Sequence, residues 1–173
     1  MPLFDKYPRL PGGHYFGCRA YFVTICCAQR RPIFADVSIG RWALAKLADV
    51  AAHRGFSLHA YCCMPDHLHV LALGLHEQSD VVKFVHGFKQ RTGYEYRRRE
   101  EGQLWQARFY EHILRSADAI EEVAGYIWMN PVRKGICAEA SLYALSGSQT
   151  MAWMNFRPSG AGWVPPWKEK RPG

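Results

Sequence analysis

The order of strand-like and helix-like segments is the feature that most constrains the fold of this 173-residue chain. Runs of β-branched and aromatic residues predict strands, and apolar residues at helical spacing predict helices. Two strand-like runs are separated only by Met64-Pro65-Asp66, which predicts a hairpin. The order β-α-β-β-α-β-α indicates an α+β fold, with helices packed on a ferredoxin-like (RRM-like) antiparallel sheet. The expected strands are 17–28, 56–63, 67–73 and 104–114, and the expected helices are 38–52, 79–99 and 117–129.

The two ends of the chain lack this periodicity. Residues 1–15 are rich in Pro, Gly and Tyr and are expected to form an irregular arm. Residues 138–173 carry three tryptophans among Pro and Gly and are expected to form an irregular C-terminal tail. A chain of this length suits one domain, which we place at residues 1–137 with the arm included. Ser38 and Ser116 are the expected helix N-caps.

The apolar and cysteine content points to the cytoplasm. The longest apolar run, 20–28, is broken only by Thr24 and is far shorter than the roughly 20 residues that span a bilayer, so no membrane partner is expected. The first residues also lack a signal pattern. The pairs Cys26-Cys27 and Cys62-Cys63 lie in predicted strands, where neighbours point to opposite faces. We therefore expect buried core cysteines rather than disulfides or a metal site.

The charge balance favours a polyanionic partner. Lys and Arg exceed Asp and Glu by 22 to 15, a net charge of +7 with a pI near 9.2. Basic and aromatic residues alternate between positions 83 and 110, a pattern suited to single-stranded or hairpin nucleic acid. The alternative is a solvated helix face beside ordinary core aromatics. The predicted nucleic-acid contacts are Arg91, Arg97, Arg98, Trp105, Arg108, Arg133 and Lys134, with a structural role equally open for Arg108.

His67-Leu68-His69 is the sharpest motif of the sequence. Residues two apart on a strand share a face and lie roughly 6.5–7 Å apart along it. Two imidazoles in that arrangement can converge on one divalent metal. The alternative is a pair of surface or hydrogen-bonded histidines without a metal.

Tyr126 and Asn130 form a second notable pair. They are four residues apart on a predicted helix, so their side chains are neighbours, with Glu122 one turn earlier. We expect the helix to end at Asn130, because a residue before proline avoids the α region. Its carboxamide oxygen would then be available to a hard cation. The alternative for Tyr126 is a residue at the rim of the core.

Together these motifs resemble those of a known family. Residues 64–70 (MPDHLHV) resemble the M-P-(D/N/E)-H-hydrophobic-H stretch of the single-tyrosine HUH transposases. Residues 104–112 (LWQARFYEH) and 126–135 (YIWMNPVRKG) are similar to two signatures of the REP-associated tyrosine transposases within that superfamily. The resemblance covers about residues 12–137. Gly125 departs from it, where a polar residue is expected, and its lack of a side chain should loosen that helix turn.

The resemblance implies a function that the spacing alone does not. It implies a metal-dependent endonuclease and strand transferase that acts on single-stranded DNA at REP-like hairpins through a 5′-phosphotyrosine intermediate. Tyr126 would be the nucleophile, and His67, His69 and Asn130 would ligate Mg²⁺ or Mn²⁺. His112 and Glu122 are the possible general bases.

Other possibilities stay open at this point. One is a non-catalytic regulator that binds single-stranded or hairpin nucleic acid on the same fold. Another is a small metal-dependent hydrolase that uses water as the nucleophile. Either a monomer or a homodimer is compatible with the sequence.

Overall fold

The computed structural model describes residues 15–100, 102–115, 120–156 and 163–168. The strands are β1 (Ala20–Cys26), β2 (Phe56–Met64), β3 (His67–Gly74), β4 (Tyr110–Ile113) and β5 (Ser146–Gly147). The α-helices are α1 (Val37–His53), α2 (Val81–Arg97), α3 (Ile120–Trp128) and α4 (Asn130–Arg133). Short 3-10 helices are η3 (Ala28–Arg30), η4 (Ile33–Ala35), η5 (Ala140–Leu142), η6 (Trp153–Asn155) and η7 (Pro166–Lys168). No helix in these ranges is long and apolar enough to cross a membrane.

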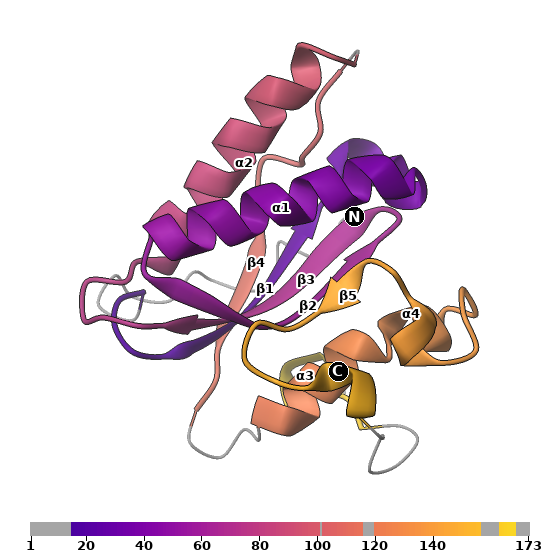
Figure 1. The fold of residues 1–173 in the computed structure, drawn as a ribbon. Helices are drawn as coiled ribbons and strands as arrows, with labels where there is room; N and C mark the ends of the chain where they lie inside the picture. The colour runs from indigo at the N-terminus through magenta and orange to yellow at the C-terminus, as the bar shows by residue number, and fades with distance from the viewer. Residues whose placement is uncertain (1–14, 101, 116–119, 157–162, 169–173) are drawn as a thin grey trace, which may run out of the picture.

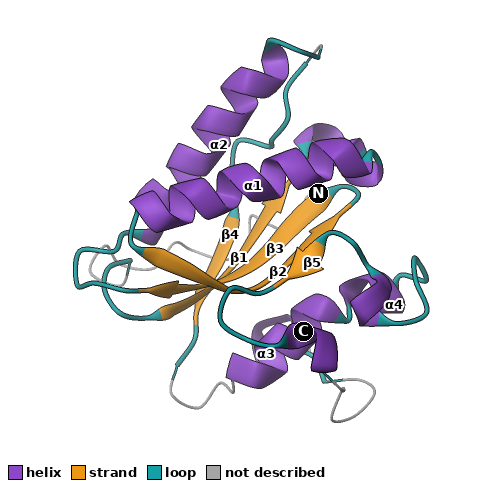
Figure 2. Cartoon of the chain, viewed as in Figure 1, coloured by secondary structure: helices purple, strands orange, loops and turns teal. Residues whose placement is uncertain are grey.

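The five strands form one antiparallel sheet in the order β4-β1-β3-β2-β5. The first four strands and the helices α1 and α2 between them make the β-α-β-β-α-β unit expected of a ferredoxin-like fold. Helices α1 and α2 cover one face of the sheet, and α3 and α4 lie on the other (Figures 1 and 2). The predicted α+β class is therefore confirmed.

Alternation along the strands builds a separate apolar cluster on each face. Val23 and Ile25 of β1 pack with α1 and α2, whereas Phe22 packs with α3 on the opposite side. Cys63 and Cys62 divide between the two clusters in the same way, and both thiols are free and buried. The predicted placement of this pair in the core is confirmed. The two faces of the sheet consequently carry different sets of side chains.

Several element boundaries differ from the sequence expectations. Helix α1 is capped by Asp36, whose carboxylate accepts from the backbone N–H groups of Ser38 and Ile39, so Ser38 is not the cap. Strand β4 spans only four residues of the expected 104–114, because the chain before it makes a single bridge from Trp105 to Cys27. The expected cap Ser116 and the first 14 residues of the expected arm 1–15 lie outside the described residues.

The chain does not leave helical structure at Asn130. The helix is interrupted at Met129, and a new helix, α4, begins at Asn130. Pro131 lies in its first turn, where the missing N–H of proline is not needed. As expected, the tail beyond residue 138 has little regular structure. It nevertheless contributes β5, which pairs with β2 at the edge of the sheet. Its aromatic residues pack on the α3 face of the sheet, with the larger ones being Trp153, Phe156, Trp163 and Trp167.

Candidate active site

His67 and His69 lie on the α3 face of the sheet, where the central strand β3 begins. Their partners on β1 are Cys26 and Thr24, respectively. Both side chains are largely buried, with 7% and 4% of their surface exposed. Leu68 between them points into the opposite apolar cluster, as the strand period requires. The predicted sharing of one face is therefore correct.

The two imidazoles converge through the same ring atom. Nε2 of His67 lies 3.0 Å from Nε2 of His69. Nδ1 of His67 lies 2.6 Å from Oδ1 of Asp66, and Nδ1 of His69 lies 2.8 Å from Oγ1 of Thr24. Each Nδ1 has an oxygen that can accept a proton from it, and in that tautomer both Nε2 lone pairs are available to a metal. Without a metal, the 3.0 Å contact is a hydrogen bond in which one Nε2–H donates to the other Nε2. The two histidines can therefore act as metal ligands, with Asp66 and Thr24 as the hydrogen-bond partners of their Nδ1 atoms.

Charges near the pair favour neutral imidazole at His69. Burial lowers the pKa of His69 well below its usual value, and the nearby positive charges of Lys168, Arg133 and Arg30 lower it further. The hydrogen bond to His67 lowers the pKa of the Asp66 carboxyl, and the nearby positive charge of Arg30 contributes to the same effect. A neutral His69 and an ionised Asp66, which contacts His67, are the states that suit cation binding.

Tyr126 of α3 meets the histidine pair across one aromatic ring. Phe22 of β1 has its ring centroid 5.5 Å from that of His69 and 6.4 Å from that of Tyr126. The guanidinium of Arg133 lies over the Tyr126 ring, 4.1 Å from its centroid, and donates to the Tyr126 carbonyl at 2.7 Å. Tyr126 is partly buried at the edge of the α3 cluster. The helix and the central strands thus bring the predicted nucleophile and metal ligands to one face.

Asn130 is the third predicted ligand. It is 5% exposed, and its buried Nδ2 has no hydrogen-bond partner within the described residues. A half-turn of the carboxamide would present its oxygen in the same place. Among the described residues no cluster of three or more His, Cys, Asp or Glu could hold a metal. A cation on the histidine pair would therefore need a ligand of another type, which a carboxamide can supply.

Residues near the C-terminus also line this face of the sheet, and the sequence analysis did not place them there. Trp167 stacks on His112 of β4, with ring centroids 3.7 Å apart. The Nζ of Lys168 lies over the rings of Phe22 and Tyr110, at 5.3 and 5.5 Å from their centroids. Trp163 contacts the Tyr126 ring edge-on at 6.4 Å. A Trp-Pro-rich stretch gives no periodic signal that could have placed these side chains.

The predicted nucleic-acid contacts divide between the two layers. Arg133 and Lys134 belong to α4 or follow it directly, on the side of the histidine pair. Arg91, Arg97 and Arg98 lie on or just after α2, on the opposite side of the sheet. The structure therefore does not gather these cations into one surface beside the histidines.

Two other predicted contacts have contrasting environments. Trp105 is only 7% exposed, with its ring packed against Phe34 and Phe88 and its Nε1 donating to Thr92 at 2.8 Å. It is a core residue, and we leave it out of the proposed nucleic-acid surface. Arg108 is exposed on the chain leading into β4.

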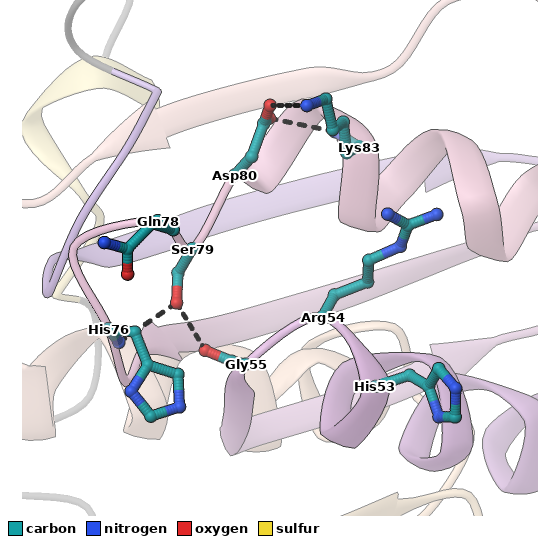
Figure 3. A pocket seen from close by; sticks show the side chains of 8 residues that line it. All are labelled: His53, Arg54, Gly55, His76, Gln78, Ser79, Asp80 and Lys83. Carbon is teal, nitrogen blue, oxygen red and sulfur yellow. Dashed lines mark hydrogen bonds and ion pairs between the residues drawn. The ribbon is translucent and has the colours of Figure 1, made fainter.

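A pocket of about 330 Å³ lies at the other end of β3 and includes none of the predicted site residues. Figure 3 shows Ser79 at its centre, where the hydroxyl donates to the Gly55 carbonyl at 2.7 Å and accepts from the His76 N–H at 3.1 Å. Lys83 forms an ion pair with Asp80 in the same pocket. These contacts stabilise the junction of α1, β2 and α2.

The fold, together with the residues that a family model matches, identifies a transposase. A family model described as "Transposase IS200 like" matches residues 15–130, and the chain belongs to this family. It is 30% identical over 128 residues to a protein of Haemophilus influenzae assigned as a REP-associated tyrosine transposase. That match covers 66% of this chain and 71% of the relative.

One solved structure shares the fold, and a second is less similar. A REP-associated tyrosine transposase bound to a REP hairpin superposes with a TM-score of 0.66 at 22% identity, covering 82% of this chain and 81% of that one. A Deinococcus radiodurans protein described as a transposase candidate gives a TM-score of 0.49 at 19% identity, covering 75% and 92%.

Proposed function

We propose that this transposase cuts and rejoins single-stranded DNA beside REP-like hairpins, with Tyr126 as the nucleophile and a divalent metal as cofactor. The observation that carries the proposal is that Tyr126 and His69 pack against the same ring, Phe22. Hairpin DNA as the partner is supported by the relative of similar fold that is bound to a REP hairpin. Because both groups come from one chain, we propose the monomer as the catalytic unit.

Mg²⁺ or Mn²⁺ would be held by His67, His69 and Asn130. The fit rests on the converging Nε2 atoms and on the buried side chain of Asn130, whose Nδ2 has no hydrogen-bond partner among the described residues. When bound, the cation would supply Lewis-acid polarisation of the scissile phosphate. Asp66 and Thr24 would keep the ring protons on Nδ1, so that both Nε2 lone pairs stay available.

The chemistry of the chain itself centres on the Tyr126 phenol. Its Oη attacks the phosphorus, an Oη–P bond forms, and the bond from phosphorus to the 3′ oxygen breaks. The products are a 5′-phosphotyrosine and a 3′-hydroxyl. The phenol loses one proton and the 3′ oxygen gains one. Attack by a second 3′-hydroxyl reverses the step and joins strands. His112, which stacks on Trp167, and Glu122, which is exposed on α3, stay the possible general bases.

The same proposal assigns the DNA contacts. Arg133 and Lys134 would contact phosphates near the scissile bond, because they lie on the Tyr126 side of the sheet. Arg91, Arg97, Arg98 and Arg108 would contact DNA farther from it. Arg91 is the least available of these, since it lies near the carboxylates of Asp49 and Glu95 at 3.7 and 3.6 Å.

Trapping of a covalent adduct tests the proposal. The full chain is incubated with Mn²⁺ and an oligonucleotide that carries a hairpin and a nick which prevents rejoining. We expect an adduct that mass mapping places on Tyr126, that EDTA abolishes, and that Tyr126→Phe does not form although it still binds the hairpin. Hairpin binding without any cleavage would instead indicate a regulator. Cleavage without an adduct would indicate a hydrolase that uses water.

A further inference from the structure

Two consecutive residues after β1 adopt a backbone conformation that their side chains disfavour. Gln29 and Arg30 have φ values of 55° and 56°, in the left-handed region where glycine is the favoured residue. Holding two such residues in sequence costs free energy, and strain of this kind persists where the surrounding structure gains from it. The segment that follows β1 must therefore make contacts that offset the strain.

Those contacts lead to the turn that carries His67. The Cys27 N–H donates to the Asp66 carbonyl and the Phe34 N–H donates to the Pro65 carbonyl, each at 2.9 Å. The backbone on either side of the strained pair is thus bonded to the β2–β3 turn. This arrangement places the Arg30 side chain beside the first residue of β3.

The guanidinium of Arg30 then contacts two groups that flank His67. Its Nε lies 3.1 Å from Oδ2 of Asp66, and its Nη1 donates to Sγ of Cys26 at 2.9 Å. Asp66 precedes His67 in the chain, and Cys26 is the residue paired with His67 across β1 and β3. The other carboxylate oxygen of Asp66 is the one that lies 2.6 Å from Nδ1 of His67.

We propose that Arg30 is a positioning residue: its guanidinium fixes the Asp66 carboxylate, which in turn fixes the orientation and the Nδ1–H tautomer of His67. The inference rests on the proposed function, since its purpose is to aim Nε2 of His67 at a cation. A partly exposed ion pair contributes little to folding by itself, because water screens it. The strained backbone is therefore better explained by the alignment of His67 than by stability.

The test compares two glycine substitutions in the full chain. Arg30→Gly relieves strain and removes the guanidinium, whereas Gln29→Gly relieves strain at the adjacent residue and keeps it. We expect both variants to be at least as stable as the wild type in urea unfolding. We expect Arg30→Gly alone to bind Mn²⁺ at least 10-fold more weakly, the loss typical when an outer partner of a metal ligand is removed.

A second readout needs no metal. In ¹⁵N-edited NMR spectra of the chelated protein, His67 of the wild type and of Gln29→Gly should show the Nδ1–H tautomer, and Arg30→Gly should show a mixture. Arg30→Asn, whose side chain tolerates the left-handed region, replaces the glycine variant if that one fails to fold. Addition of Asp66→Asn to Arg30→Gly should cost little further Mn²⁺ affinity, because both changes break the same chain of contacts.

The outcomes separate this inference from the function on which it rests. Wild-type tautomer and wild-type Mn²⁺ affinity in Arg30→Gly would overturn the positioning role, while the adduct assay could still succeed. Weakened Mn²⁺ binding in both glycine variants would also overturn it, since the loop conformation rather than the guanidinium would then be responsible. Absence of any adduct with the wild type would reject the proposed function and leave the tautomer comparison to decide the role of Arg30.

Discussion

The guanidinium of Arg133 covers the ring of Tyr126, with Cζ 4.1 Å from the ring centroid. A hydrogen bond from the same guanidinium to the Tyr126 carbonyl fixes it there. A cation on the face of an aromatic ring contributes about 0.5–2 kcal/mol, depending on its exposure to water. Arg133 therefore holds the proposed nucleophile in one orientation and lies where it can also meet a phosphate.

Replacement of Arg133 should affect the chemical step more than DNA binding. We expect Arg133→Ala to slow adduct formation at saturating DNA by about tenfold, which corresponds to about 1.4 kcal/mol in the barrier. Single-turnover assays measure this rate. Lys134→Ala is the matched control, because it removes a neighbouring exposed cation with no described contact to Tyr126. Equal rates in the two variants would contradict an orienting role for Arg133.

The buried, neutral state of His69 should make folding sensitive to mild acid. Burial lowers its pKa in the folded protein, so below the unfolded value of about 6.5 the unfolded chain binds more protons. Stability is then present above that value and is lost as the pH falls below it. From pH 7.5 to 5.5, His69 should account for about 1.4 kcal/mol of lost stability. Urea unfolding in EDTA measures this, and a parallel loss in His69→Gln would show that other groups are responsible.

Two helical glycines should respond to alanine in opposite directions. A Cβ at Gly125 of α3 would lie 2.5 Å from Cζ of Phe156, whose ring is itself packed edge-on against Trp128. Gly125→Ala should destabilise the protein by about 1–2 kcal/mol. At Gly93 of α2, by contrast, the first neighbouring atom is Cδ1 of Trp105 at 3.9 Å, so Gly93→Ala should stabilise by about 0.5–1 kcal/mol. Thermal or urea unfolding gives both values, and a stabilised Gly125→Ala would show that the Phe156 contact is not maintained.

The salt dependence of hairpin binding should reveal whether both layers contact DNA. Each phosphate contact that is lost lowers the slope of log affinity against log salt by about 0.7–0.9. We expect the slope to fall by about 0.7–0.9 in Lys134→Gln and by roughly twice that in the double variant with Arg97→Gln and Arg98→Gln. Arg41→Gln, an exposed change on α1, controls for net charge. An unchanged slope for the double variant would restrict DNA to the α4 side.

Local sequence patterns predicted most of the core architecture. The two-residue period placed His67 with His69 on one face and separated Cys62 from Cys63, because this period is fixed by the strand itself. The cap of α1 was misplaced by two residues, since Asp36 and Ser38 are both good caps and only the backbone geometry selects between them. Strand β5 has two residues, too few for any period to be visible.

Contacts between distant segments were the part that the sequence could not supply. Nothing local links Trp167 to His112 or Arg30 to Asp66, because each pair is joined only by the folding of the sheet. Gly125 illustrates the same limit. Its absence of a side chain was expected to loosen α3, yet the helix runs through it, and the reason for the glycine is the ring of Phe156 placed against it from the tail.

The division of cations between the two layers has a consequence for the path of a bound strand. Arg97 ends α2 and Arg98 follows it, and α2 lies on the opposite side of the sheet from α3, which carries Tyr126. A single DNA molecule that touches both sides must pass round the margin of the sheet, either beside an edge strand, β4 or β5, or past the ends of the strands. Stiff duplex cannot turn so tightly over such a short distance. The stretch between the hairpin stem and the scissile bond would then have to be unpaired, with its length set by the path round the sheet rather than by its base sequence.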